Sequence, residues 1–226
     1  MFCNQTFARM QHYATRHQYT FYPVWHKPNV KAASAWQKVF IMHTIFESNT
    51  TGYDIIAWMD ADIYVANLNI SLENYFSLTD CQTSIILSRD VDNYTPTHFI
   101  NFAVFFLRYD QTSRKFIQRM VEQYYAMAYY QTNIFMEQSV ATLLVYEEFS
   151  EWTSVLPMCF IQYFWNVKYR MWQTGGFLLH MVDQPIKNRL NTLNFISNNS
   201  QSVWEETFAN ISQITCFNEF SQILLR

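Results

Sequence analysis

The segment from Asp54 to Val65, DIIAWMDADIYV, constrains the fold more than any other part of the chain. It opens with a continuous apolar run, which is typical of a strand buried on both faces of a sheet. Two carboxylates, Asp60 and Asp62, follow at the carboxyl end of that run. An uncompensated carboxylate at such a place costs on the order of several kcal/mol, so we expect the two to be paired or to bind something.

Strand and helix patterns alternate along the rest of the chain, and no Pro/Ser-rich linker, charge block or repeat interrupts them. This order favours a single α/β domain over residues 1–226. Further strands are predicted at 18–25, 83–89, 100–108, 154–160 and 177–182. Helices are predicted at 5–17, 33–48, 111–129 and 134–147, with another over about the last twenty residues.

Composition excludes several functions. The chain has only three glycines, Gly52, Gly175 and Gly176. A dinucleotide fingerprint needs three glycines at fixed spacings and a P-loop needs two before a lysine, so neither pattern can be present. A phosphorylated substrate would therefore require another source of positive charge. The net charge of −3 gives no electrostatic footprint for nucleic acid, and we expect no such partner.

Sequons point toward the secretory pathway. Chance predicts roughly two or three Asn-x-Ser/Thr acceptor sites in such a chain. Six are present, at Asn4, Asn49, Asn69, Asn93, Asn198 and Asn210. The four cysteines match no zinc spacing and are either buried thiols or partners in one or two disulfides. The chain as given contains no membrane-spanning apolar stretch and no signal peptide.

The D-x-D triplet is the strongest candidate for chemistry. In an extended chain Asp60 and Asp62 would face opposite ways, but a turn past the strand end can bring both onto one hard cation. The carboxyl edge of a sheet is also where open α/β folds bind ligands. The alternative is a helix N-cap or a solvated turn, as in many D-x-D triplets. The apolar run before the triplet favours the metal site.

Five segments in order carry a family resemblance: Trp36-Gln37-Lys38, Trp58-Met59-Asp60-Ala61-Asp62, Asn101 to Arg108, Glu137-Gln138-Ser139 and Leu178-Leu179-His180. They resemble segments of GT-A fold glycosyltransferases, most closely the retaining α-galactosyl/α-xylosyltransferase family, glycosyltransferase family 34. That family shows a W-x-K helix start, a D-x-D strand, an N-T-G strand, an acidic helix start with Gln, and a late strand ending in His. The order and approximate spacing agree over residues 5–185.

The resemblance implies an α/β fold, a single GT-A (Rossmann-like) domain with a central mixed sheet flanked by helices. It implies a metal-dependent retaining glycosyltransferase that moves a hexosyl or pentosyl group from a UDP- or GDP-sugar to a hydroxyl of a glycan acceptor. GT-A domains begin with a strand, whereas only Met1 to Asn4 precede the first predicted helix, so we expect that first strand to be missing. Location in the Golgi lumen is expected, with a membrane anchor outside this chain.

The resemblance also implies site residues. Asp60, Asp62 and His180 would hold Mn²⁺ or Mg²⁺, and an oxygen and imidazole set suits Mn²⁺. The metal would act as a Lewis acid toward the leaving diphosphate. Gln138 would lie near the anomeric carbon, beside Glu137, which stands where the family usually has Asp. Retention of configuration at the anomeric carbon with a neutral amide in this place favours attack from the same face as the leaving group, without a covalent intermediate.

Four further residues are implied as substrate contacts: Asn101 for the donor sugar, and Lys38, Arg108 and Lys187 for phosphate. Phe102-Ala103 follow Asn101 where the family has Thr-Gly, which closes backbone room beside the sugar. Lys187 is predicted to lie in a loop after His180.

Two other functions fit part of the sequence. One is a carbohydrate-binding or assembly partner with the catalytic fold but no turnover, because the aromatic content of 19% would suit sugar stacking. The other is a phosphatase of the haloacid dehalogenase type, whose nucleophilic Asp also ends a hydrophobic strand in D-x-D. Against the phosphatase, Ile63-Tyr64 stand where that class needs a small residue and Thr or Val.

Overall fold

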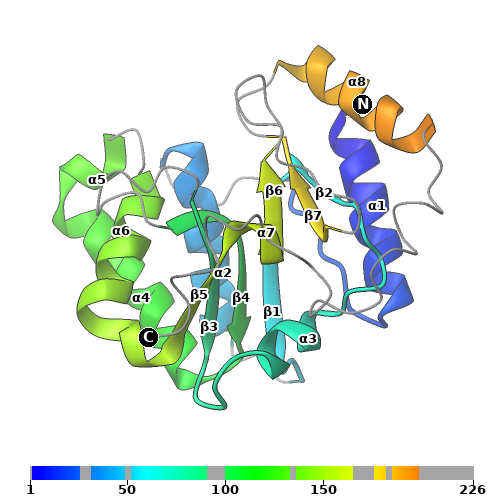
Figure 1. Cartoon of the computed structure of the whole chain (residues 1–226). Coiled ribbons are helices and arrows are strands. Elements are labelled where there is room, and N and C mark those ends of the chain that lie inside the picture. The colour runs from blue at the N-terminus through cyan, green and yellow to red at the C-terminus, as the bar shows by residue number, and fades with distance from the viewer. Residues whose placement is uncertain are drawn as a thin grey trace. The chain divides into compact units, whose positions relative to one another are not determined.

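The computed structural model describes residues 2–25, 32–48, 52–90, 100–132, 136–164, 176–181 and 185–198. Contacts divide the chain into two compact units (Figure 1). The first unit is drawn from 1–23, 59–75 and 157–226, and the second from 24–58 and 76–156. The prediction of one domain over residues 1–226 stays a prediction.

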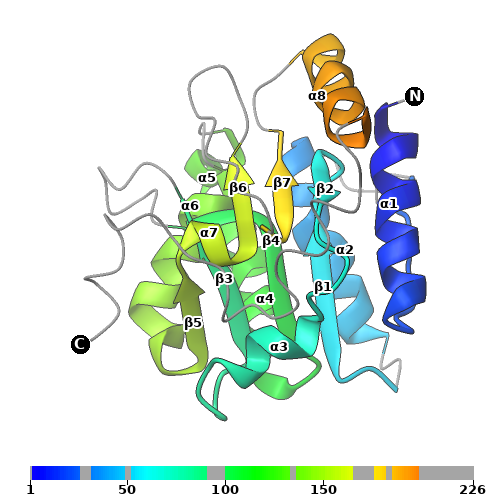
Figure 2. The same ribbon diagram turned by 45° about the vertical axis from the view of Figure 1, so that its right-hand side comes forward.

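The second unit is built on a four-stranded mixed sheet in the order β1-β4-β3-β5. β3 pairs antiparallel with β4 and parallel with β5. Figures 1 and 2 show α2, α4 and α6 on the same face of this sheet. Its strands and helices are η1 (Ser34–Trp36), α2 (Gln37–Glu47), β1 (Ile55–Met59), β3 (Ile85–Arg89), β4 (Ile100–Arg108), α4 (Gln111–Ala126), α5 (Ala128–Thr132), α6 (Met136–Leu144), the π-helical η3 (Val145–Phe149), η4 (Ser150–Trp152) and β5 (Thr153–Leu156).

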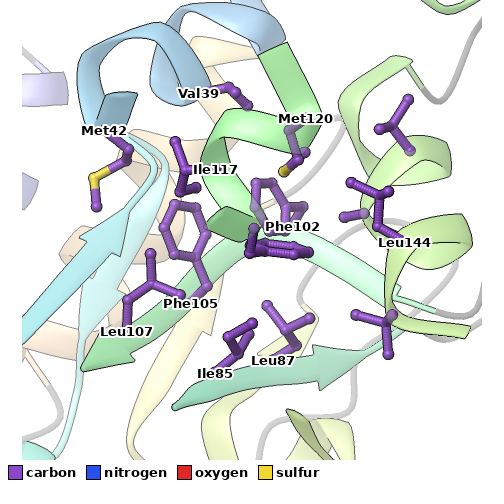
Figure 3. Close-up of a cluster of buried hydrophobic side chains, with 14 of the residues drawn as sticks. Val39, Met42, Ile85, Leu87, Phe102, Phe105, Leu107, Ile117, Met120 and Leu144 are labelled. Carbon is purple, nitrogen blue, oxygen red and sulfur yellow. The ribbon is translucent and has the colours of Figure 1, made fainter. Parts of the chain in front are cut away.

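The core of the second unit lies between this sheet and its helices (Figure 3). Phe102 and Phe105 of β4 are fully buried and stack with ring centroids 4.3 Å apart. They meet Ile117 and Met120 from α4 and Val39 from α2, all fully buried in the same cluster. Burial of this aromatic and aliphatic surface is the main force that holds helices and strands together here.

The first unit contains a smaller mixed sheet in the order β2-β7-β6. β7 pairs antiparallel with β2 and parallel with β6. The elements of this unit are α1 (Phe2–Arg16), β2 (Ile63–Val65), α7 (Met158–Ile161), β6 (Gln162–Phe164), β7 (Leu178–His180) and α8 (Ile186–Asn198), and α3 (Leu72–Ser77) crosses the boundary between units along the chain.

Helix α1 is fastened to the chain around β2 by buried polar side chains. Arg9 donates from Nε to the Val65 carbonyl at 2.8 Å and from a terminal nitrogen to the Ala66 carbonyl at 3.2 Å. Thr6 Oγ1 donates to the Ala61 carbonyl at 2.9 Å. Because Ala61 is the middle residue of the D-x-D triplet, α1 fixes the backbone of that triplet.

Most predicted elements are confirmed, and the mixed sheets with packed helices confirm the predicted fold class. β4 has the predicted bounds. Three predictions are wrong: residues 18–25 form no strand, β5 ends at Leu156 and is followed by a helical turn, and Lys187 lies in α8 rather than in a loop. The predicted final helix, over about the last twenty residues, lies outside the described residues.

Cys159 forms a disulfide, whereas Cys3 and Cys81 are free thiols. Cys81 is exposed, so the expectation of buried thiols does not hold for it. None of the helices in the described part of the chain is long and apolar enough to cross a bilayer.

At the end of α1, glutamine occupies a backbone position where glycine is usual. The Tyr19 N–H donates to the Ala14 carbonyl at 2.8 Å and the Gln18 N–H to the Thr15 carbonyl at 3.3 Å, the bonds of a Schellman motif. Gln18 has φ of 61° at the position where such motifs usually place glycine. A side chain in this left-handed region costs about 1–2 kcal/mol.

Replacement of Gln18 with glycine should therefore raise the free energy of unfolding by up to about 1 kcal/mol, as measured by urea denaturation followed by circular dichroism. Gln11→Gly in the exposed interior of α1 is the control and should lower it by about 1 kcal/mol. A loss of stability in Gln18→Gly would contradict the assignment of this cap.

Candidate functional site

An irregularity in β4 creates the polar cluster of the second unit. Leu87 of β3 pairs with Phe105, but the next residue, Ser88, pairs with Asn101. Residues 102–104 therefore have no partner in β3 and form a bulge. The Phe102 ring remains in the core, while its peptide N–H and C=O are engaged by side chains from helices.

Gln138, in the first turn of α6, binds this bulge. Its Oε1 accepts the Phe102 N–H at 3.2 Å, and its Nε2 donates to Asp90 Oδ2 at 2.7 Å. Asp90 directly follows β3, and the antiparallel pairing of β3 with β4 places it at the same sheet edge as Asn101.

A buried ion pair lies beside this contact. Lys38 Nζ is 3.3 Å from Glu137 Oε1 and donates to the Phe102 carbonyl at 3.0 Å. Both side chains are less than a tenth exposed. Lys38, Asp90, Glu137, Gln138 and the Phe102 peptide form what we call the Gln138 cluster. Three of the residues predicted from the sequence are thus brought together.

The D-x-D triplet forms a tight turn in the first unit. The Ile63 N–H donates to the Asp60 carbonyl at 3.0 Å, and the chain then enters β2. The strand register brings this turn next to His180, because Ile63 lies opposite His180 in the antiparallel pair of β2 and β7. Asp62 Oδ1 is consequently 3.6 Å from His180 Nε2.

Arg189 completes this second group, which we call the Asp62 cluster (Asp62, His180 and Arg189). Its terminal nitrogen lies 3.4 Å from Asp62 Oδ2. The imidazole is almost fully buried, while the carboxylate and the guanidinium are each about one-fifth exposed. Asp62 therefore lies between an imidazole and a cation.

Arg189 and Asp90 were not predicted as site residues, although the sequence contains a pattern that indicates each of them. Pro185 immediately before Ile186 marks a helix start, and Arg189 lies four residues before the buried Leu193, on the same helical face. Asp90 directly follows a predicted strand, which is the criterion that singled out Asp60.

Four predicted residues lie elsewhere or have other local contacts. Asn101 is buried, and its Oδ1 accepts the Ala103 N–H at 3.1 Å. Arg108 lies at the opposite end of β4 from Asn101, roughly 20 Å away for seven residues of strand. Its Nε donates to the Thr83 carbonyl at 2.7 Å. Lys187 is exposed, and Asp60 is half-buried in the turn.

The Asp62 cluster offers donors that suit a divalent cation. Carboxylate oxygen and imidazole nitrogen are the ligand types predicted for Mn²⁺. Two donors about 2.1 Å from one ion lie roughly 3.0–3.6 Å apart for angles of 90–120°, and the observed separation of 3.6 Å is compatible with this. Among the residues that the structure describes, no three His, Cys, Asp or Glu side chains are grouped to hold a metal, so Asp60 remains a predicted third ligand.

Comparison with known proteins identifies the fold. No family model and no curated protein matches the sequence. A solved glycosyltransferase involved in the glycosylation of the major capsid of PBCV-1 superposes with a TM-score of 0.66 and 18% identity, covering 86% of this chain and 92% of that one. The chain has the GT-A glycosyltransferase fold. The resemblance found in the sequence is confirmed at the level of this fold.

Two further solved structures align more weakly. Mouse xyloside xylosyltransferase 1 has a TM-score of 0.44 and 14% identity, with 66% of this chain and 65% of that chain covered. The galactosyltransferase LgtC, in complex with donor and acceptor sugar analogues, has a TM-score of 0.47 and 12% identity, with 76% and 69% covered. The GT-A assignment rests on the first comparison.

Replacement of Lys38 with methionine should lower the free energy of unfolding by about 3–5 kcal/mol, because it leaves the buried Glu137 carboxylate without its cation. Addition of Glu137→Leu should restore most of that loss, as measured by urea denaturation.

Arg114→Met is the matched control, since it removes an ion pair to Glu47 that is 3.9 Å long and partly exposed. We expect it to cost less than about 1 kcal/mol. Equal losses in Lys38→Met and Arg114→Met would show that burial of the Lys38 pair is not what the structure indicates.

Proposed function

We propose that the protein is a metal-dependent retaining glycosyltransferase that moves a hexosyl or pentosyl group from a nucleoside-diphosphate sugar to a glycan hydroxyl. The observation that carries the proposal is the pairing of Asp62 with His180 in a GT-A fold. These residues are 118 positions apart in the chain, and β2–β7 register brings them together. A carboxylate and an imidazole at the ends of paired strands are ligand types that suit a divalent cation.

The Asp62 cluster is assigned to the metal and the diphosphate. Asp62 and His180 would hold Mn²⁺ or Mg²⁺, with Asp60 from the same turn as a further ligand. When bound, the ion would supply the positive charge that offsets the charge developing on the leaving diphosphate. This replaces the glycine-lined phosphate cradle that the composition excludes. The guanidinium of Arg189, 3.4 Å from Asp62, would add a second positive charge beside the metal ion.

The Gln138 cluster is assigned to the sugar. The amide oxygen of Gln138 can stabilise positive charge at the anomeric carbon without forming a covalent bond, which is consistent with front-face retention. Lys38 and Glu137 are paired in the interior and hold the start of α6 against the bulge of β4. We therefore assign them a supporting part. Asn101 is kept as a candidate donor-sugar contact.

The proposal includes a location for the protein in the lumen of the Golgi or of another compartment of the secretory pathway. The six sequons and the disulfide of Cys159 support it. Asn4 is exposed and Asn69 is half-buried, while Asn49, Asn93 and Asn210 lie outside the described residues. Asn198 ends α8, and the structure describes its backbone only.

A nucleoside diphosphate with Mn²⁺ should stabilise the protein. At a concentration one hundred times its Kd, the ligand adds about 2.7 kcal/mol, or roughly 5–10 °C in melting temperature for a chain of this size. UDP and GDP should be compared by thermal shift, each with and without Mn²⁺.

Asp62→Asn should abolish the metal-dependent part of the shift, and Asp54→Asn, an exposed acid on the same segment, should retain it. A shift that persists in full in Asp62→Asn removes Asp62 from the metal site. The absence of any shift in the unmodified protein with either nucleotide would contradict the proposed function.

Gln138→Ala should lower kcat by about 100-fold and change the KM for donor by less than about threefold, because its assigned interaction strengthens only in the transition state. The measurement is steady-state transfer or donor hydrolysis. A parallel rise in KM that accounts for the whole loss would instead mark Gln138 as a ground-state contact.

A further inference from the structure

The orientation of the Gln138 amide is selected at both of its ends. The Phe102 N–H, 3.2 Å from Oε1, can only donate, and the Asp90 carboxylate, 2.7 Å from Nε2, accepts. If the amide were turned by 180°, two donors would meet at Phe102 and two acceptors at Asp90. The two contacts therefore require the same orientation, with the oxygen held at the bulge.

These two constraints come from different elements. Asp90 follows the last residue of β3, Phe102 belongs to the bulge of β4, and Gln138 belongs to α6. The Phe102 peptide is itself fixed, because its ring stacks on Phe105 in the core and its carbonyl accepts from Lys38. The Phe102 N–H therefore holds the amide oxygen of Gln138 in place, and Asp90 fixes the rotation of the amide group by accepting from its nitrogen.

We propose that Asp90 is a positioning residue for the reaction, which holds Nε2 of Gln138 and so presents Oε1 to the positive charge that develops on the donor sugar. The proposal rests on the function assigned above. A carbonyl oxygen has two lone pairs, and the Phe102 N–H engages one of them. The other is the group that a cationic sugar ring would meet.

Asp90 also affects the electron density of that oxygen. When an amide N–H donates to a carboxylate, resonance moves negative charge from nitrogen toward the carbonyl oxygen, and chains of hydrogen bonds strengthen one another in this way. The carboxylate therefore acts through Gln138 and needs no contact with substrate. An aspartate that orients and polarises a neutral side chain plays the same part in the Ser-His-Asp triad.

The test compares Asp90→Ala, Asp90→Asn and the control Asp80→Asn. Asp90→Ala removes the acceptor, whereas Asp90→Asn keeps an oxygen that can accept from Nε2 but removes the charge. Asp80 is an exposed aspartate just before β3, and its Oδ1 accepts the Gln82 N–H at 3.0 Å, a bond that asparagine can also make. Asp80→Asn should match the unmodified protein in every measurement.

The first readout needs no activity. In protein labelled with ¹⁵N at glutamine, the side-chain amide signal that disappears in Gln138→Ala is assigned to Gln138. Asp90→Ala should move its proton shifts toward those of an exposed amide and speed their exchange with water, and Asp90→Asn should keep them protected. An unchanged Gln138 signal in Asp90→Ala overturns the proposal.

The second readout is the division between kcat and KM for the nucleoside-diphosphate sugar. Asp90→Ala should lower kcat by about 10- to 100-fold, the scale seen when outer partners of metal ligands are removed, with KM changed less than about twofold. Asp90→Asn should recover part of kcat. A loss confined to KM, or equal kcat in Asp90→Ala and the unmodified protein, overturns the proposal.

Failure of the two proposals can be distinguished. If the unmodified protein neither binds nor turns over a nucleoside-diphosphate sugar, the proposed function fails, and the amide signal alone then decides whether Asp90 holds Gln138. If it does turn over the donor but Asp90→Ala leaves the amide signal and kcat unchanged, the positioning role fails and the transferase stands.

Discussion

The peptide group of Phe102 is the point on which the polar cluster of the second unit depends. β4 leaves its register with β3 for three residues, and buried backbone groups that lose ladder partners must find others. Gln138 takes the N–H and Lys38 takes the carbonyl. Because the Phe102 ring stacks on Phe105 in the core, the peptide cannot move without disturbing the apolar packing, and the side chains bound to it are fixed in turn.

Each unit compensates buried or half-buried charge in the same manner. In the second unit Glu137 faces Lys38, and in the first unit Asp62 faces Arg189 and His180. The physical reason is the cost of removing a carboxylate from water without a counter-charge. Such groups are expensive to bury, and in both units an opposite charge or an imidazole within 4 Å offsets that cost.

Sequence reasoning succeeded where a local pattern and the fold agree. The bounds of β4 and the turn after β1 follow from strand patterns, and the grouping of Asp62 with His180 follows from the family resemblance. It failed at residues 18–25, where aromatic residues favour a strand but none forms. A strand requires a partner, and there Tyr19 instead follows the cap of α1 and accepts the Leu72 N–H through its hydroxyl at 3.0 Å.

The sequence by itself determined the α/β class and the exclusion of glycine-rich phosphate loops, and it predicted Asp60, Asp62, Gln138 and His180 as candidate site residues. Only the tertiary structure revealed which partners they have. Arg189 reaches Asp62 because α8 presents one face to the protein, and Asp90 reaches Gln138 because an antiparallel register joins the end of β3 to the bulge of β4. Partners of this kind are set by distances between elements, which no local pattern of residues contains.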